Sequence, residues 1–170
     1  DYYGGIDGVR DIQVLSPTKK GNVGTIELNR VLQETFNPHR EGISEKKSMD
    51  RVFRVGDKVM QIKNNYQMEW KILSRGEAGQ GVFNGDVGFI AYIDAKNQNL
   101  TVIYDDEKYV EYDFSQLDEL ELAYAVTVHK SQGSEFPIMV MPISWFPPML
   151  ATRNLLYTAV TRGKKVVVLV

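Results

Sequence analysis

A short segment in the last third of the chain concentrates side chains that can bind phosphate. It reads Thr127-Val128-His129-Lys130-Ser131-Gln132-Gly133-Ser134-Glu135-Phe136. Lys130, Ser131 and the backbone N–H groups near Gly133 can hold phosphate oxygens without a metal, and Glu135 can accept a hydrogen bond from a ribose hydroxyl. The competing interpretation is an ordinary helix end with polar side chains in solvent, and composition alone favours it.

A second segment, 154–163, predicts a helix that ends with Arg162 immediately before a glycine. A guanidinium at a rigid helix end offers a planar fork of permanent charge, which suits a γ-phosphate. Taken alone, the simpler interpretation is that Arg162 and Lys164 complement the negative end of the helix, an effect of about 0.3 to 1 kcal/mol.

A third segment, Ser16 to Gly24, contains hydroxyl, amine and exposed backbone groups, including Thr18 and Lys19. It lies between a strand pattern and a helix pattern, which is where α/β folds place ligand sites. A charged surface turn explains the same residues equally well.

The elements that would position these segments follow from hydrophobic periodicity. Residues 12–15 predict a strand. Leu28, Val31, Leu32 and Phe36, together with Thr35, are spaced at i, i+3, i+4, i+8 and i+7 and predict a helix over about 28–36. Near the other end, the sequence predicts a helix over 120–130, a strand over 138–141, a helix over 149–161 and a buried strand over 166–170. Buried strands that alternate with helices indicate an α/β layer.

The middle of the chain has a different pattern. From Val52 the apolar period is two, turn residues separate the runs, and ten of the eighteen aromatic residues lie between 52 and 114. Four or five short strands in this length predict a small all-β barrel. We therefore expect a discontinuous α/β domain, residues 1–51 and 115–170, interrupted by a barrel domain at 52–114, with 40–51 as a polar linker.

Composition excludes several classes of protein. The chain has no cysteine and only two histidines, which argues against a thiol nucleophile, a disulfide framework and most protein-held metal sites. The first five residues lack the basic and apolar regions of a signal peptide, and no membrane-spanning run is present, so we expect a cytoplasmic protein without membrane contact. The net charge is −2, but from Leu122 onward five basic residues accompany one acidic residue. Any binding of nucleic acid would therefore depend on a locally basic part of the surface.

Taken in order, the three segments resemble the C-terminal motor half of RecD-like superfamily 1 DNA helicases, the exodeoxyribonuclease V alpha-subunit family. Residues 12–17 with Gly21, Gly24 and 28–33 are similar to a motif between that family's fourth and fifth helicase signatures, 125–136 to motif V and 155–162 to motif VI. Residues 53–61 and 84–88 resemble the Src-homology-3-like barrel inserted in the second RecA-like domain. The resemblance implies a partial RecA-like parallel sheet with helices on both faces, interrupted by this barrel.

The resemblance also implies roles for individual residues. It makes Arg162 an arginine finger for the γ-phosphate of ATP and places Gln132, Gly133 and Glu135 near the nucleotide. It places six residues near single-stranded DNA: Thr18, Lys19, Thr127, His129, Lys130 and Ser131. The barrel, with a charge of −3 over 52–114, is expected to border the DNA through aromatic or steric contacts rather than a basic field.

Two departures from a complete motor are visible. No G-x-x-x-x-G-K-[ST] sequence is present, so a phosphate-binding loop is missing. The run 102–107 imitates a magnesium-binding strand, but it continues into a period-two pattern, and a hairpin turn is the better interpretation. We therefore expect ATP and Mg²⁺ in a longer parent protein, with the Mg²⁺ ligands outside this chain.

We therefore predict that this chain is a fragment of an ATP-dependent DNA helicase in DNA recombination and repair, and that the fragment is inactive by itself. The resemblance implies that the parent helicase moves 5′ to 3′. Its partners would be single-stranded DNA, the missing N-terminal RecA-like domain and other exodeoxyribonuclease subunits. Two alternatives stay open. One is a non-enzymatic DNA- or protein-binding module, and the other is the helicase part of a conjugative relaxase. A phosphate-binding loop upstream in the parent reading frame would exclude the first, and an upstream nicking domain would indicate the second.

Overall fold

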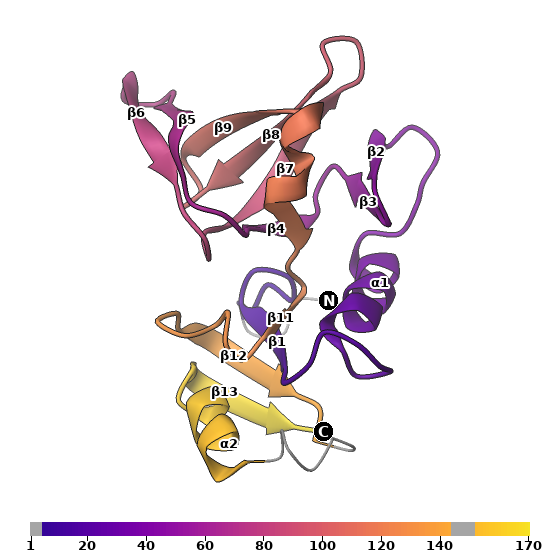
Figure 1. Ribbon diagram of the computed structural model, residues 1–170, viewed down its shortest axis with the longest axis vertical. Helices are drawn as coiled ribbons and strands as arrows, with labels where there is room; N and C mark the ends of the chain where they lie inside the picture. The colour runs from indigo at the N-terminus through magenta and orange to yellow at the C-terminus, as the bar shows by residue number, and fades with distance from the viewer. Residues whose placement is uncertain (1–4, 144–151) are drawn as a thin grey trace. The chain divides into compact units, whose positions relative to one another are not determined.

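The computed structural model describes residues 5–143 and 152–170, which divide into two compact units. The first unit combines residues 1–36 with 124–170, and the second contains residues 37–123 (Figure 1). The sequence placed these boundaries at 51/52 and 114/115, so residues 37–51 and 115–123 belong with the second unit instead. Strand pairing and hydrogen bonds within the second unit explain the difference.

The first unit is an α/β layer built on a four-stranded parallel sheet with the order β11-β1-β12-β13. Its elements are β1 (Ile12–Ser16), α1 (Thr25–Phe36), β11 (Ala125–Thr127), β12 (Phe136–Met141), α2 (Arg153–Val160) and β13 (Gly163–Leu169). Leu15, Met139 and Met141 are fully or almost fully buried and form part of the core. The predicted α/β class and the strand at 138–141 are thus confirmed.

Three details of this unit differ from the sequence-based prediction. The region 120–130 is not a helix but contains β10 (Leu120–Leu122), β11 and a series of turns. The strand predicted at 166–170 is β13, but it pairs on one side only among the described residues, and Val166 and Leu169 are 46% and 42% exposed. Of the helix predicted over 149–161, the structure shows α2, and Met149 lies outside the described residues.

Helix α1 forms where the apolar spacing predicts it, but a polar stripe faces inward. Thr25, Asn29 and Gln33 are the buried residues, whereas Val31 and Phe36 are 45% and 44% exposed. The Asn29 side chain donates to the carbonyl of Ala125 and accepts from its N–H, both at 2.8 Å. These two bonds attach the helix to β11 and satisfy backbone groups that would otherwise be buried without partners.

The second unit is an antiparallel sheet of seven strands with the order β10-β4-β7-β8-β9-β5-β6, together with a separate β2–β3 hairpin. Besides β10, its elements are β2 (Glu45–Ser48), β3 (Arg51–Arg54), β4 (Lys58–Gln61), β5 (Asn65–Ile72), β6 (Glu77–Val82), β7 (Val87–Asp94), β8 (Asn99–Tyr104), β9 (Lys108–Asp113) and η1 (Phe114–Glu119). One hydrophobic core, with Phe53, Leu100 and Tyr112 fully buried, lies within this unit.

The segment predicted as a polar linker, 40–51, is instead held in the second unit. Strand β2 pairs with β3, and the buried Arg54 side chain forms an ion pair with Glu45 and donates to the carbonyl of Asn37. At the other boundary, β10 pairs with β4. These contacts explain why both boundaries shift outward along the chain.

The turn between β8 and β9 confirms that residues 102–107 form a hairpin. Asp105 and Asp106 both adopt positive φ, 51° and 60°, and Asp105 forms an ion pair with Lys108. Two successive left-handed residues are typical of the tight hairpin turn whose twist matches the flanking strands. The carboxylates of this run therefore serve a surface turn.

Candidate nucleotide and DNA site

The candidate DNA-binding residues gather at one edge of the parallel sheet. Strands β1 and β11 are parallel neighbours, and Ser16 at the end of β1 pairs with Thr127 at the end of β11. The loop that carries Thr18 and Lys19 and the turn that carries His129 and Lys130 therefore leave the sheet at the same edge. Lys19 and His129 are exposed, whereas Thr18, Thr127 and Lys130 are partly exposed.

The loop after β1 is compact and held by its own polar groups. The hydroxyl of Ser16 donates to the carbonyls of Thr18 and Val23 at 3.0 and 2.6 Å. A Cβ on Gly24 would lie 2.5 Å from the carbonyl oxygen of Lys20, so only glycine fits there. The loop thus presents Lys19 on a defined surface beside the end of β11.

The turn after β11 uses Ser131 structurally. Ser131 is 0% exposed, and its hydroxyl donates to the carbonyl of Val128 at 2.7 Å. Its N–H bonds to the carbonyl of Thr127, and Gly133 closes the turn with a φ of +83°. In this conformation the Ser131 side chain cannot meet a DNA phosphate, contrary to its predicted role.

Arg162 and Glu135 lie at the opposite, amino-terminal edge of the sheet. They directly precede β13 and β12, whose first residues, Gly163 and Phe136, are paired. The guanidinium of Arg162 donates to the carbonyl of Ser134 and to the hydroxyl of Thr161, both at 3.3 Å. Its Nε is buried and has no hydrogen-bond partner among the described residues. Arg162 is therefore held beside the end of the 128–135 turn by long hydrogen bonds, with one donor unsatisfied.

Glu135 is kept ionised by its neighbours. Its carboxylate forms an ion pair with Lys164 at 2.9 Å. The hydrogen bond from Lys164 lowers the pKa of Glu135, and the nearby charges of Lys164 and Arg162 act in the same direction. An anionic Glu135 can accept from a ribose hydroxyl, provided that it shares or releases Lys164.

A hollow of about 380 Å³ brings the motif V-like turn together with the motif VI-like helix. Its lining comes from both segments: Val128, His129, Gln132, Thr152, Asn154, Leu155 and Thr158. Gln132 and the neighbouring Gly133 are exposed and can approach a ligand. The sequence alone did not single out Asn154 and Thr158 as lining residues, or Asn29 as the bridge between α1 and β11. Of these, only Asn29 could have been found from the sequence, because Thr25, Asn29 and Gln33 recur every four residues and so form a polar stripe on one face of the helix.

Neither a metal cluster nor a membrane span is found in the part of the chain that the structure describes. Within 5–143 and 152–170, no three His, Asp or Glu side chains are grouped to hold a metal ion. No helix in the same ranges is long and apolar enough to cross a membrane.

Comparison with known proteins shows which family the chain resembles. Residues 28–104 match the ATP-dependent RecD-like DNA helicase SH3 domain, and residues 122–170 match the UvrD-like helicase C-terminal domain. The ATP-dependent RecD2 DNA helicase of Deinococcus radiodurans is 35% identical over 159 residues, which cover 94% of this chain and 20% of the relative. The chain resembles RecD-like helicases in both of its units.

Other relatives agree with this assignment. The RecBCD enzyme subunit RecD of Buchnera aphidicola subsp. Acyrthosiphon pisum is 27% identical over 95% of the RecD-like chain and 25% of that subunit. The crystal structure of Bacteroides Pif1 bound to ssDNA matches with a TM-score of 0.60 at 17% identity, over 93% of this chain and 40% of Pif1. This likeness shows a shared fold. The RecD-like chain spans only a fifth to a quarter of the two named sequence relatives.

Proposed function

We propose that the parent protein is an ATP-dependent DNA helicase that translocates on single-stranded DNA and unwinds duplex DNA, and that this chain is the second half of its motor. One observation carries the proposal. A single turn, 128–135, begins at the sheet edge that holds the candidate DNA residues and ends beside Arg162 at the other edge. Such a turn can couple a nucleotide to a DNA strand. The name of the Deinococcus radiodurans relative supports the activity.

In this proposal the chain contributes Arg162 to an ATP site shared with a first motor domain. A γ-phosphate would offer acceptors to the guanidinium fork, whose hydrogen bonds within 5–143 and 152–170 are long and whose Nε has no partner there. Gln132, Gly133 and Glu135 would border the nucleotide. Since the chain contains no phosphate-binding loop, the loop lysine and the Mg²⁺ ligands would come from that first domain. Bound Mg²⁺ neutralises charge on the β- and γ-phosphates.

Several finer assignments belong to the same proposal. The chain alone would be inactive, and the parent would be a cytoplasmic recombination and repair enzyme of the exodeoxyribonuclease V alpha type that moves 5′ to 3′. The name of the Buchnera relative supports a parent that works with further subunits of such a complex.

The DNA contact surface of this chain is proposed to consist of Thr18, Lys19, Thr127, His129 and Lys130. We expect the chain to bind a labelled oligothymidylate weakly and with steep salt dependence. Roughly three to five phosphate contacts give a slope of log K against log salt of about −2 to −3.5. Fluorescence anisotropy should therefore show affinity falling about 20- to 100-fold between 50 and 200 mM salt.

A double variant and a single-site control locate this contact. The double variant Lys19→Ala/Lys130→Ala should reduce the slope by about 1.4, since each phosphate contact on a single strand contributes about 0.7. Lys96→Ala, in an exposed turn of the second unit, should leave the slope unchanged. A slope that responds equally to both changes, or binding that ignores salt, would contradict the proposed surface.

A further inference from the structure

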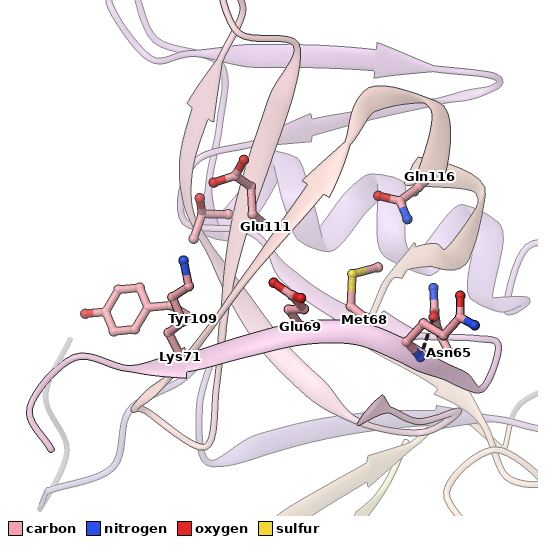
Figure 2. A pocket seen from close by; sticks show the side chains of 9 residues that line it. Asn65, Met68, Glu69, Lys71, Tyr109, Glu111 and Gln116 are labelled. Atoms are coloured by element: carbon pink, nitrogen blue, oxygen red, sulfur yellow. Dashed lines mark hydrogen bonds between the residues drawn. The ribbon is translucent and has the colours of Figure 1, made fainter. Parts of the chain in front are cut away.

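A hollow of about 680 Å³ lies in the second unit, and none of the residues assigned above lines it (Figure 2). Its lining combines strands β5, β8 and β9 with η1 and comprises Asn65, Gln67, Met68, Glu69, Lys71, Thr101, Tyr109, Glu111 and Gln116. Met68 is 6% exposed. Gln67, Glu69 and Lys71 alternate with buried or partly buried residues along β5, so they point away from the hydrophobic core. The hollow is thus on the outer face of the sheet, and its volume is within the roughly 300 to 1,000 Å³ of ligand sites.

Two carboxylates line this hollow from adjacent strands. Strand β5 pairs with β9 from Ile72 to Trp70, whose partner is Val110, and Glu69 and Glu111 are the next residues beyond this last pair. Figure 2 shows both carboxylates facing the space above β5. Like charges close together on a sheet repel each other. A cation bound between the two carboxylates would reduce this repulsion.

The carboxylates of Glu69 and Glu111 have few hydrogen bonds among the described residues and can accept further ones. Asn99 donates to one oxygen of Glu111 at 2.8 Å, and no hydrogen bond or ion pair of the Glu69 carboxylate occurs in the described part of the chain. The charge of the unit adds to the effect. Residues 37–123 contain 11 Lys and Arg against 16 Asp and Glu, a formal charge of −5, whereas the other unit has 9 against 6, or +3. A nucleic acid phosphate is therefore disfavoured in this hollow, and a cationic ligand is favoured.

We propose that this hollow docks a basic segment of a partner protein, with an arginine or lysine head between Glu69 and Glu111. The rest of the lining suits a peptide better than a small cation. The ring of Tyr109, which also lines the hollow, offers apolar surface to the aliphatic stem of such a residue. Lys71 and the amides of Gln67 and Gln116 can bond to peptide carbonyls. The acceptor Oε1 of Gln116 is already bonded to the N–H of Asp113, which leaves its NH₂ group as the donor.

The probe for this proposal is an acetylated and amidated decapeptide of alternating Arg and Gly, with a Glu-Gly decapeptide as its charge-reversed control. It is titrated into the 170-residue chain while backbone amide shifts are followed by NMR. The expected result is saturable binding of the Arg peptide only, with the largest shifts on β5 and β9. Absence of saturable shifts there up to millimolar peptide would overturn the proposal.

Charge-matched variants separate a built site from the general field of the unit. Glu69→Gln/Glu111→Gln should weaken the peptide at least about tenfold, because both charge-assisted bonds are lost. Glu41→Gln/Glu77→Gln removes the same charge from exposed positions of the same unit outside the hollow and should change affinity by less than about twofold. Equal losses in both variants would mean that only the net charge attracts the peptide.

Two more measurements distinguish a peptide site from a structural role of the carboxylates and from a nucleic acid surface. The Glu69→Gln/Glu111→Gln variant should melt at the same or a higher temperature, since it removes a like-charge neighbour, and a marked fall would assign the carboxylates to the fold instead. An oligothymidylate that shifts the same residues and displaces the peptide would show a nucleic acid surface and overturn the proposal.

Discussion

Replacing Arg162 by alanine in the full-length parent is expected to lower DNA-stimulated ATP turnover by about 10³- to 10⁵-fold. An arginine finger acts on charge that develops at the transferred phosphoryl group, so its loss appears in turnover more than in binding. Nucleotide affinity should remain largely intact because the phosphate-binding half supplies most ground-state contacts. The fold should also persist, since the Arg162 side chain makes only two hydrogen bonds within the described residues, both at 3.3 Å.

Two further variants make this prediction specific. Arg162→Lys should restore little turnover, because an ammonium keeps the charge but loses the planar fork. Arg153→Ala removes an exposed arginine from the first turn of α2, the helix that precedes Arg162, and should leave turnover nearly unchanged. A fall of less than about tenfold for Arg162→Ala in a folded protein, under about 1.4 kcal/mol on the barrier, would make Arg162 only a helix-end cation.

Asn29→Ala is expected to destabilise the α/β unit by about 2 to 4 kcal/mol. The substitution leaves the N–H and the carbonyl of Ala125 without their partner in a position where Asn29 itself is only 8% exposed. Each unsatisfied buried group costs about 1 to 3 kcal/mol. Denaturant unfolding, with hydrogen exchange of the first unit as a second probe, measures the loss.

The neighbouring residue provides the control for Asn29. Arg30 is exposed on the same helix and bonds to Glu27 on the surface, so Arg30→Ala should change stability little. If both substitutions lowered stability equally, helix propensity rather than the bridge to β11 would account for the loss.

Local pattern was sufficient where an element is defined by its own residues. The alternation along β7 to β9 and the turn residues at Asp105 and Asp106 predicted the hairpins of the second unit. The apolar run of β12 likewise predicted a buried strand. In each case the pattern reports burial directly, so the inference needs no knowledge of distant partners.

Prediction failed where partners distant in sequence decide the structure. Residues 120–127 have apolar spacing that suits a helix, yet Leu120 pairs with Gln61 and Ala125 with Val14. Long-range strand pairing overrides a weak local preference. The positions of the candidate site residues were partly predictable, since parallel strands bring their ends together. The burial of Ser131 was not, because its partner is the backbone carbonyl of Val128 within an irregular turn.

The central claim, that this chain is one half of a divided ATP site, is tested most directly by ATP hydrolysis. Turnover is measured for the purified 170-residue chain and for the full-length parent, each with and without single-stranded DNA. The account predicts DNA-stimulated turnover by the parent and none above background by the chain, which has no phosphate-binding loop. Steady turnover by the chain that is lost with Arg162→Ala would contradict the divided site, and a parent without DNA-stimulated turnover would contradict the proposed motor.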